Sequence, residues 1–171
     1  MKKSSLSQTD FPLYFKKYID LVEDRPLLEA LYNNSEETTT FFKEIPEKKH
    51  LYRYAFEKWT PKEILLHMID TERIFCYRAL FFARSENSNL IGFDENEFAK
   101  NSNANSFSME DLLIEYKAVR NSTITLFKNF DEEILKKMGK ANNYSMSVCA
   151  AGFVIRGHEI HHINIIKERY L

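Results

Sequence analysis

Residues 60–84 constrain the fold of this chain more than any other segment. Thr60, Pro61 and Glu63 combine an N-cap, a proline at the first helical position and a glutamate three residues after the cap, so a helix begins here. The following residues, to about Arg84, place apolar side chains on more than one flank of that helix. A helix that is apolar almost all round must be enclosed by other elements. The segment therefore predicts the central helix of a helical protein.

Glycine and proline are scarce, with 4 of each among 171 residues. Because turns need them, this scarcity disfavours an all-β fold and favours long helices. Apolar periodicity predicts further long helices at about 25–43, 108–130 and 147–171 and a short one at about 12–22, whereas the Asn- and Ser-rich residues 85–106 predict a long loop. We therefore predict an all-α fold: an antiparallel up-down four-helix bundle with a short extra N-terminal helix and a long loop between the second and third long helices.

The smaller segments complete this picture. Residues 131–137 are expected to form a short helix and residues 141–146 a turn. We find no internal repeat and no linker, so we expect one domain over residues 1–171, with residues 1–10 flexible. Loops as long as residues 85–106 are uncommon unless they have a function, so this one is interpreted as a lid or a pocket wall.

Composition excludes several classes of partner. The formal net charge of -1 offers no electrostatic footprint for nucleic acid. No stretch is apolar enough to span a bilayer or to act as a signal peptide. Cys76 and Cys149 lack CxxC spacing and lie in apolar stretches, which is typical of reduced, buried thiols in a cytoplasmic protein. We therefore expect a cytoplasmic protein with neither nucleic acid nor membrane as partner.

Three of the five histidines lie close together in the last predicted helix. His158 and His162 are four residues apart, which places them within about 40° on one face and about 6 Å apart along the axis. They share the inward stripe with isoleucines on either side, and His161 is rotated off that stripe by about 100°. The alternative is two core histidines with hydrogen-bond partners, but two stacked rings would need two sets of partners. The pair is better interpreted as ligands of one metal ion.

His67 is the third candidate ligand. It lies on the second turn of the predicted central helix, between apolar residues, whereas His50 is expected at the surface or in a loop. Two ligands from one helix and one from another would make a three-nitrogen site that leaves positions for water or substrate. That pattern is typical of a catalytic metal rather than a structural one. A satisfied buried histidine remains the alternative for His67.

The sequence His158-Glu159-Ile160-His161-His162 also satisfies the zincin pattern HExxH, with Glu159 in the position of the general base. Zincins take their third ligand downstream of the motif, and the nine residues after His162 contain no histidine. Peptidase activity is therefore disfavoured. Glu159 could assist a metal-activated nucleophile, but its direction off the histidine stripe favours an interhelical or surface salt bridge.

Three further polar residues are candidates for the surroundings of the site. Asp70 either orients a ligand as the acceptor of an imidazole N–H or has only a capping or solvated role. Arg78 lies on the stripe of His67, so it either lines the pocket or pairs with an acid such as Asp94 or Asp70, because a buried arginine without a partner is costly. In its functional interpretation, Arg78 holds a carboxylate of the substrate. His161 is expected to flank the metal site or meet a neighbouring helix.

Three stretches form a recognisable pattern. They are Trp59-Thr60-Pro61-Lys62-Glu63 leading to His67-x-x-Asp70-x-Glu72-Arg73 with Arg78, then Phe93-Asp94-Glu95, then Gly157-His158-Glu159-x-His161-His162 followed by Glu168-Arg169-Tyr170-Leu171. With them, most of the chain resembles the DinB-like (DinB/YfiT) superfamily of helical-bundle metalloproteins. The resemblance implies an antiparallel four-helix bundle with a metal on three histidines, which map to His67, His158 and His162.

The resemblance also implies a range of functions. The family includes metal-dependent transferases of low-molecular-weight thiols such as bacillithiol or mycothiol, and a maleylpyruvate isomerase. We therefore expect a metal-dependent enzyme acting on a small molecule, with thiol S-transfer as the leading reaction. The alternatives are a metal-dependent hydrolase and a non-catalytic, stress-related protein that binds a metal or ligand. One divalent ion is expected, zinc or nickel first, with iron or manganese also compatible. Dimers are common among the look-alikes, so a homodimer stays open.

Overall fold

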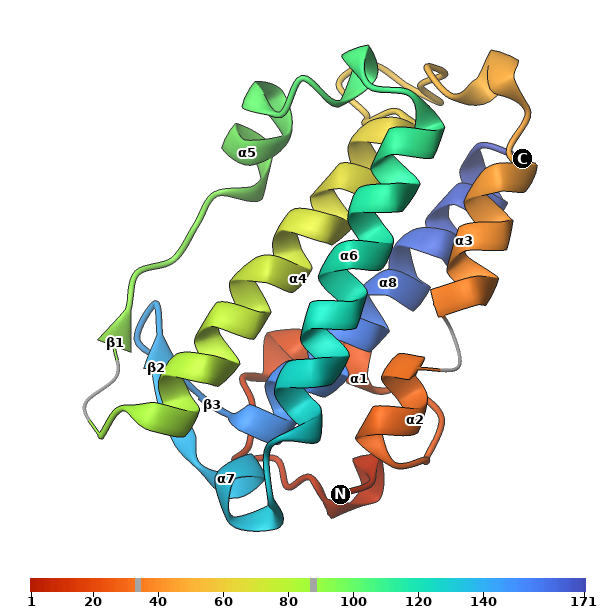
Figure 1. The fold of residues 1–171 in the computed structure, drawn as a ribbon. Coiled ribbons are helices and arrows are strands. Elements are labelled where there is room, and N and C mark those ends of the chain that lie inside the picture. Colours follow the sequence, from red (N-terminus) through yellow and green to blue (C-terminus); the bar gives the residue numbers. More distant parts are fainter. Residues whose placement is uncertain (33–34, 87–88) are drawn as a thin grey trace.

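The computed structural model describes residues 1–32, 35–86 and 89–171, and four helices of this part form a bundle (Figure 1). They are α3 (Ser35–Glu44), α4 (Pro61–Arg84), α6 (Met109–Lys128) and α8 (Val148–Arg169). The predicted central helix is confirmed as α4. It begins at a complete capping box, in which the Thr60 side chain accepts from the Glu63 N–H and the Glu63 carboxylate accepts from the Thr60 N–H. The predicted four-helix bundle is confirmed as well.

The helices do not simply alternate in direction. Glu72 and Cys76 of α4 contact Arg120 and Thr123 of α6, so the two helices run parallel (Figure 1). α8 runs antiparallel to both. The departure from strict up-down order has a physical reason in the connection between α4 and α6. Since α4 is 24 residues, or about 36 Å, long, this connection must carry the chain back over that length before α6 begins.

The predicted long loop is this returning connection. It contains β1 (Asn89–Leu90), α5 (Glu95–Asn101) and a 3₁₀ helix (Ala104–Ser106), while residues 87–88 lie outside the described part of the chain. At its far end the Asn105 amide contacts the Thr60 hydroxyl and the Glu63 carboxylate. The start of α4 and the start of α6 are thereby tied together.

The N-terminal region is more broken than expected. The helix predicted at 25–43 appears as α2 (Leu27–Tyr32) and α3, with residues 33–34 outside the described part. The helix predicted at 12–22 appears as a 3₁₀ helix (Leu13–Phe15) followed by α1 (Lys16–Ile19), and further 3₁₀ helices lie at Lys3–Ser5 and Glu47–Lys49. Within residues 1–10, the carbonyls of Met1 and Asp10 accept from the N–H groups of Leu27 and Ser147. The first residues are thus joined to distant parts of the fold.

A small sheet was not predicted. After the expected short helix, α7 (Glu132–Lys136), the chain forms an antiparallel hairpin of β2 (Met138–Ala141) and β3 (Tyr144–Ser147), and β1 adds to β2 in parallel. The turn expected at 141–146 narrows to Asn142 and Asn143, both with positive φ (51° and 64°), as a two-residue type I′ hairpin loop requires. The sheet is too small to change the mainly α-helical class.

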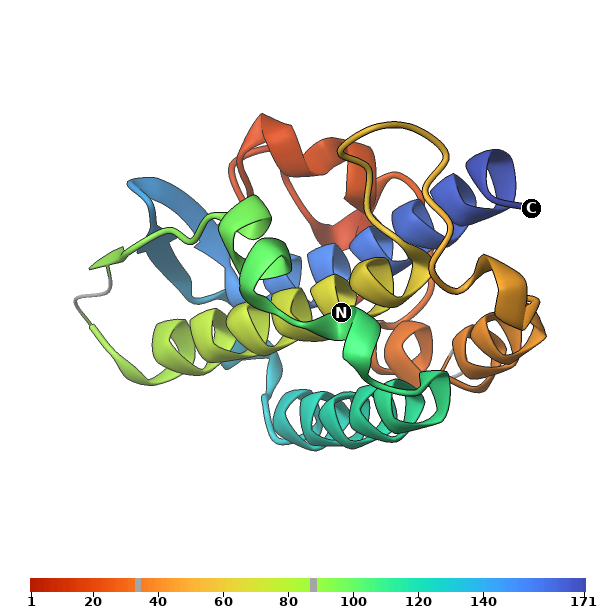
Figure 2. The same cartoon turned by 90° about the horizontal axis from the view of Figure 1, so that it is seen from above.

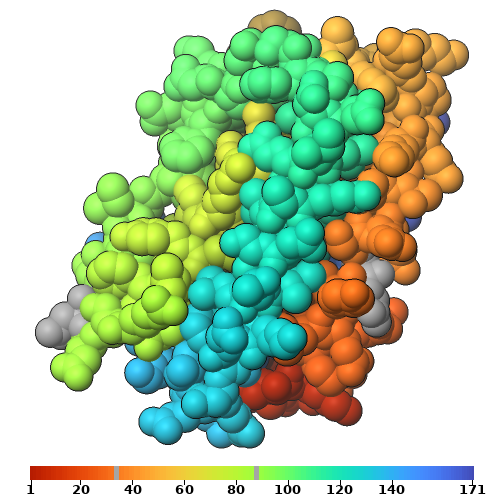
Figure 3. Space-filling model, in the orientation of Figure 1, coloured from red at the N-terminus to blue at the C-terminus, as the bar shows by residue number. Residues whose placement is uncertain are grey.

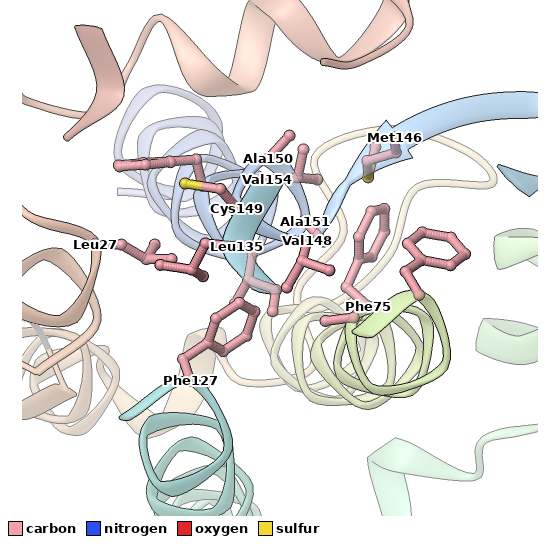
Figure 4. Packing of buried hydrophobic residues seen from close by; sticks show 14 of the residues in the cluster. Leu27, Phe75, Phe127, Leu135, Met146, Val148, Cys149, Ala150, Ala151 and Val154 are labelled. Atoms are coloured by element: carbon pink, nitrogen blue, oxygen red, sulfur yellow. The ribbon is translucent and has the colours of Figure 1, made fainter. Parts of the chain in front are cut away.

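The core is divided between the two ends of the bundle. At one end, Leu27, Phe75 and Phe127 gather from α2, α4 and α6 around the first turns of α8 (Figure 4). At the other end, α4 and α6 pack together with Phe42 and Ile166. On the face shown in Figure 3, little of α8 reaches the surface, which agrees with its role at the centre of the fold. Among the described residues, no helix is long and apolar enough to cross a membrane.

Candidate metal centre

The three predicted histidines meet at one point between α4 and α8. The Nε2 atom of His158 lies 3.0 Å from the Nε2 of His67 and 3.0 Å from the Nε2 of His162. One ring nitrogen from each residue falls within 4.8 Å of the others. His67 and His158 are buried, and His162 is partly buried. Two antiparallel helices thus place three imidazoles around a common centre.

The chemistry of this donor set fits a cation. An imidazole nitrogen carries either one hydrogen or one lone pair, so His158 Nε2 cannot make a full hydrogen bond to both neighbours at once. A cation that accepts all three lone pairs removes this conflict. Bonds of about 2.1 Å at angles of about 90–109° would place two nitrogens about 3.0–3.4 Å apart. The two separations that involve His158, 3.0 Å each, lie within that range, and all three nitrogens fall within 4.8 Å of one another.

The protonation states also suit metal binding. Burial lowers the pKa of His67 to about 4. Burial, together with the neighbouring imidazoles, holds the pKa of His158 and of His162 well below the ordinary value. At neutral pH all three rings are therefore uncharged and keep a lone pair for a metal, which is the form that metals bind.

Close packing around the rings fixes their positions. A Cβ atom at Gly157 would lie 2.1 Å from the backbone oxygen of Tyr18, so only glycine lets α1 approach α8 this closely. The Tyr18 ring then packs nearly perpendicular to the His158 ring, with centroids 5.4 Å apart. On the other side, the Trp59 ring lies 4.6 Å from that of His67. The glycine before His158 in the motif thus has a packing role.

The histidines open into a cavity of ≈ 740 Å³. Its walls come from α4, α8, the hairpin, the N-terminal segment and the start of α5. Figure 2 shows the N-terminal segment and the connection with α5 on the side of α4 and α8 that faces away from α6. Most of the lining is aromatic or aliphatic, and among its polar members are Thr71, Arg78 and Glu95. The predicted pocket wall from the long loop is represented by Gly92, Phe93 and Glu95.

Glu159 lies away from this cavity, in a buried network between α4, α6 and α8. Its carboxylate accepts hydrogen bonds from Tyr116 (2.7 Å), Arg120 (2.6 Å) and Arg156. Burial by itself would raise the pKa of Glu159, but Arg120, Arg156 and the Tyr116 hydroxyl hold that pKa below its ordinary value. The carboxylate is thus fully engaged by its neighbours, as the interhelical interpretation expects and unlike the general base of an HExxH peptidase.

The other candidate residues divide between the cavity and the surface. Arg78 is buried and lines the cavity, whereas Asp94 caps α5 by accepting from the N–H groups of residues 96 and 97. Asp70 pairs with Arg73 at 3.3 Å and has no hydrogen bond to the histidines. His161 flanks the site, with its ring 5.1 Å from that of His162. Arg78 is therefore the one of these four that the structure brings into the cavity.

Sequence reasoning missed several residues of the cavity. Tyr18 and Phe15 come from the N-terminal segment, about 140 residues from α8 in the chain, and no local pattern links them to the histidines. Thr71 lies one turn after His67 on the same face of α4, and its buried hydroxyl has no hydrogen-bond partner among the described residues. The helical spacing from His67 was the signal that could have identified Thr71.

Comparison with known proteins agrees with this architecture. The sequence profile of the DinB superfamily matches residues 30–166, whereas a search of curated proteins gives no match. YfiT from Bacillus subtilis, described as a probable metal-dependent hydrolase with an unusual four-helix bundle topology, is 15% identical, with a TM-score of 0.74 over 96% of this chain and 87% of its own. A DinB-like protein from Bacillus subtilis, YjoA, is 15% identical, with a TM-score of 0.60 over 83% of this chain and 87% of its own. These structures share the fold, and the profile covers most of the sequence. The chain therefore belongs to the DinB superfamily.

Proposed function

We propose that this chain is a metal-dependent enzyme that transfers a small thiol to an electrophile, using a nucleophile activated at His67, His158 and His162. One observation carries the proposal. Three uncharged imidazole nitrogens from two helices converge at the wall of a largely apolar cavity of ≈ 740 Å³. A structural site would surround its metal with protein ligands on all sides, whereas three ligands beside a cavity leave room for a reactant.

The residues of the chain have distinct parts in this proposal. A divalent cation bound by the three imidazoles would lower the pKa of a thiol or water, so that the nucleophile exists near neutral pH. The rings of Tyr18 and Trp59 pack against the histidines and keep bulk water from them. The Thr71 hydroxyl, which has no other partner in the described structure, offers a hydrogen bond one turn away on α4. The aromatic walls then hold the electrophile in place.

The absence of a carboxylate from the described cluster of metal-ligating side chains favours a thiol over water as the nucleophile. Among the described residues, the cluster of metal-ligating side chains contains histidines only. Hydrolysis of an amide or ester gains from an acid–base group that protonates the leaving group, whereas a thiolate that displaces chloride from a chloronitrobenzene forms a C–S bond and releases an anion that needs no proton. Hydrolysis is the second candidate, because YfiT, which shares the fold, is described as a probable metal-dependent hydrolase.

The test compares two histidine variants after loading with Zn²⁺ or Ni²⁺. Wild type, His67→Ala and His50→Ala are each given a chloronitrobenzene or an epoxide with cysteine, coenzyme A or another small thiol, and a parallel panel of esters and amides. His50 is the matched control, because its ring is hydrogen-bonded to the Ile45 carbonyl and does not line the cavity. We expect metal-dependent consumption of thiol that falls at least about 100-fold in His67→Ala and persists in His50→Ala.

Each other outcome has a definite meaning. Turnover of esters or amides without any thiol would replace thiol transfer by hydrolysis. Tight metal binding with no turnover of either panel would favour the non-catalytic binding protein. Equal activity in wild type and His67→Ala, or failure of wild type to bind any divalent metal, would remove the three-histidine centre from the proposal altogether.

A further inference from the structure

Arg78 is a buried cation with no counter-ion among the described residues. The residue is 8% exposed and lines the same cavity as the histidines. Burial lowers the pKa of Arg78, and no neighbouring acid opposes that shift. A guanidinium nevertheless stays protonated in proteins, so a positive charge remains in the cavity. A charge that is both buried and unpaired is costly, and such groups normally have a partner.

Aromatic rings hold the guanidinium without using its hydrogen-bond donors. Its central carbon lies 4.8 Å from the centroid of the Phe75 ring and 5.8 Å from that of Phe93. These cation–π contacts fix the position of the group, while its N–H donors have no protein acceptor in the described structure. The arrangement leaves a rigid fork of donors open to a ligand.

The place of Arg78 along α4 sets the shape of that ligand. His67, Thr71, Phe75 and Arg78 follow one face of the helix and all line the cavity. The eleven residues from His67 to Arg78 correspond to roughly 16 Å along the helix axis. Because Arg78 contacts Phe75, three residues earlier, the guanidinium leans toward the histidines and shortens this span. The walls between the two ends are mainly aromatic and aliphatic.

From this arrangement we infer that Arg78 is the anchor for the carboxylate of an elongated organic acid whose apolar body lies along the cavity and whose other end reaches the histidines. The guanidinium can bind a carboxylate through two parallel hydrogen bonds. The buried hydroxyl of Thr71, midway along the same face, provides a further polar contact. In placing the reacting end at the histidines, the inference rests on the proposed function, but binding of the acid at Arg78 stands independently.

Glu95 is the acid that would compete for this site. It lines the cavity, but it is exposed and makes no ion pair with Arg78. An exposed carboxylate is well solvated, so an ion pair with Arg78 would lower its free energy only slightly. A carboxylate of a ligand enclosed by apolar walls is shielded from water, so its charge-assisted hydrogen bonds with Arg78 are stronger. Arg78 is therefore expected to pair with the buried carboxylate of a ligand rather than with the exposed Glu95.

The first experiment needs no metal. The chelator-treated full chain is titrated calorimetrically with octanoate and with octanol, which has the same chain without a charge. The variants are Arg78→Met and, as matched control, Arg73→Met, which removes an exposed arginine from the same helix. We expect octanoate to bind Arg78→Met about 10- to 100-fold more weakly than wild type, with octanol binding and the Arg73→Met results unchanged.

A loss of octanoate binding in Arg78→Met can be distinguished from a loss of folding. Replacing a buried arginine that has no counter-ion by methionine is expected to leave the melting temperature of the metal-free protein unchanged or higher. A purely structural role for Arg78 would instead lower it. Equal octanoate affinity in wild type and Arg78→Met, or octanoate binding no better than octanol in wild type, would overturn the inference.

A second experiment tests the span between the two ends. The protein is loaded with Co²⁺ and titrated with ω-mercaptooctanoate or mercaptopropionate, while the sulfur-to-cobalt charge-transfer absorption is followed. Arg78→Met should weaken binding of the longer acid and leave the shorter one unchanged, because the shorter acid cannot reach both ends. An equal effect on both acids would overturn the elongated ligand. If Co²⁺ does not bind, the metal proposal fails while the octanoate titration still decides the role of Arg78.

Discussion

Helices α4 and α8 carry two buried polar clusters on different faces, and the contrast between them separates function from stability. On the face toward the N-terminal segment lie His67, His158 and His162, which share the cavity with Tyr18. On the face toward α6 lies a charged network centred on Arg120. His158 and Glu159 are adjacent in sequence, yet they belong to different clusters, because successive residues of a helix point about 100° apart.

The charged network is closed, in the sense that protein groups satisfy the hydrogen bonds of its carboxylates. The Glu72 carboxylate accepts from Arg120 at 2.8 and 2.9 Å and from Thr123 at 2.6 Å, and the Glu159 carboxylate is equally surrounded. Arg120 also donates to the Leu31 carbonyl and is fully buried. The histidine cluster is the opposite case, since three ring nitrogens converge and no arrangement of their hydrogens gives each of them a partner within the cluster. Buried polar groups that satisfy one another's hydrogen bonds stabilise the fold. Buried polar groups that lack partners beside a cavity indicate a binding site.

The largest expected effect follows from opening the closed network. Arg120→Met leaves two buried carboxylates without their main partner, so the free energy of unfolding should fall by about 3–5 kcal/mol. Urea unfolding of the metal-free protein at neutral pH measures this. Arg73→Met is the control, because its pairs with Asp70 and Glu115 are exposed and should contribute less than about 1 kcal/mol. Similar losses in both variants would show that the network does not stabilise the fold as described.

The next effect comes from filling the incomplete cluster. Zn²⁺ or Ni²⁺ at about 100 times its dissociation constant should raise the free energy of unfolding by about 2.7 kcal/mol. His67→Ala should abolish this gain, whereas His50→Ala should keep it. The measurement is urea unfolding with and without metal, beside elemental analysis of each dialysed protein. If metal still raised the free energy of unfolding of His67→Ala, the ion would have to bind at another site.

A smaller effect tests whether the two clusters are independent. Glu159→Gln weakens the bonds from Arg120 and Arg156 and should lower the free energy of unfolding by about 2 kcal/mol. One metal ion per chain should still bind, because the carboxylate does not line the cavity. The control is Glu168→Gln, at an exposed position whose change should stay within about 0.5 kcal/mol. If Glu159→Gln no longer bound metal, the histidine cluster would depend on the charged network.

The parts of this structure that could be predicted from sequence are those with local signals. The capping box at Thr60 fixes the start of α4 within a few residues, and the four-residue spacing of His158 and His162 fixes their common face. The parallel direction of α4 and α6 had no such signal. The long polar connection was recognised and interpreted as a lid or a pocket wall; part of it does line the cavity, and its length also returns the chain along α4.

Two features were missed although the sequence did contain a signal. Asn142-Asn143 is a residue pair that tolerates positive φ, so it could have indicated the two-residue hairpin loop. Arg120 shares the stripe of Tyr116 and Phe127 at helical spacing, and a charged residue on an apolar stripe indicates a buried partner. The partner itself, Glu72, could not be read from the sequence, because pairing depends on how α4 and α6 are placed. The same holds for Tyr18 beside His158.

Cys76 gives the smallest effect, on reactivity rather than stability. Its Sγ lies 3.0 Å from the Thr123 hydroxyl, at the edge of the closed network, and burial raises the pKa of its thiol from 9.0 to about 12. A raised pKa lowers the thiolate fraction at any given pH, so alkylation by iodoacetamide at pH 8 should be about 1,000-fold slower than for an ordinary cysteine and should rise about tenfold per pH unit. Mass spectrometry of native and urea-unfolded protein measures this. Rapid native modification would mean that water enters the network readily, and the distinction between a closed and an incomplete cluster would then not hold.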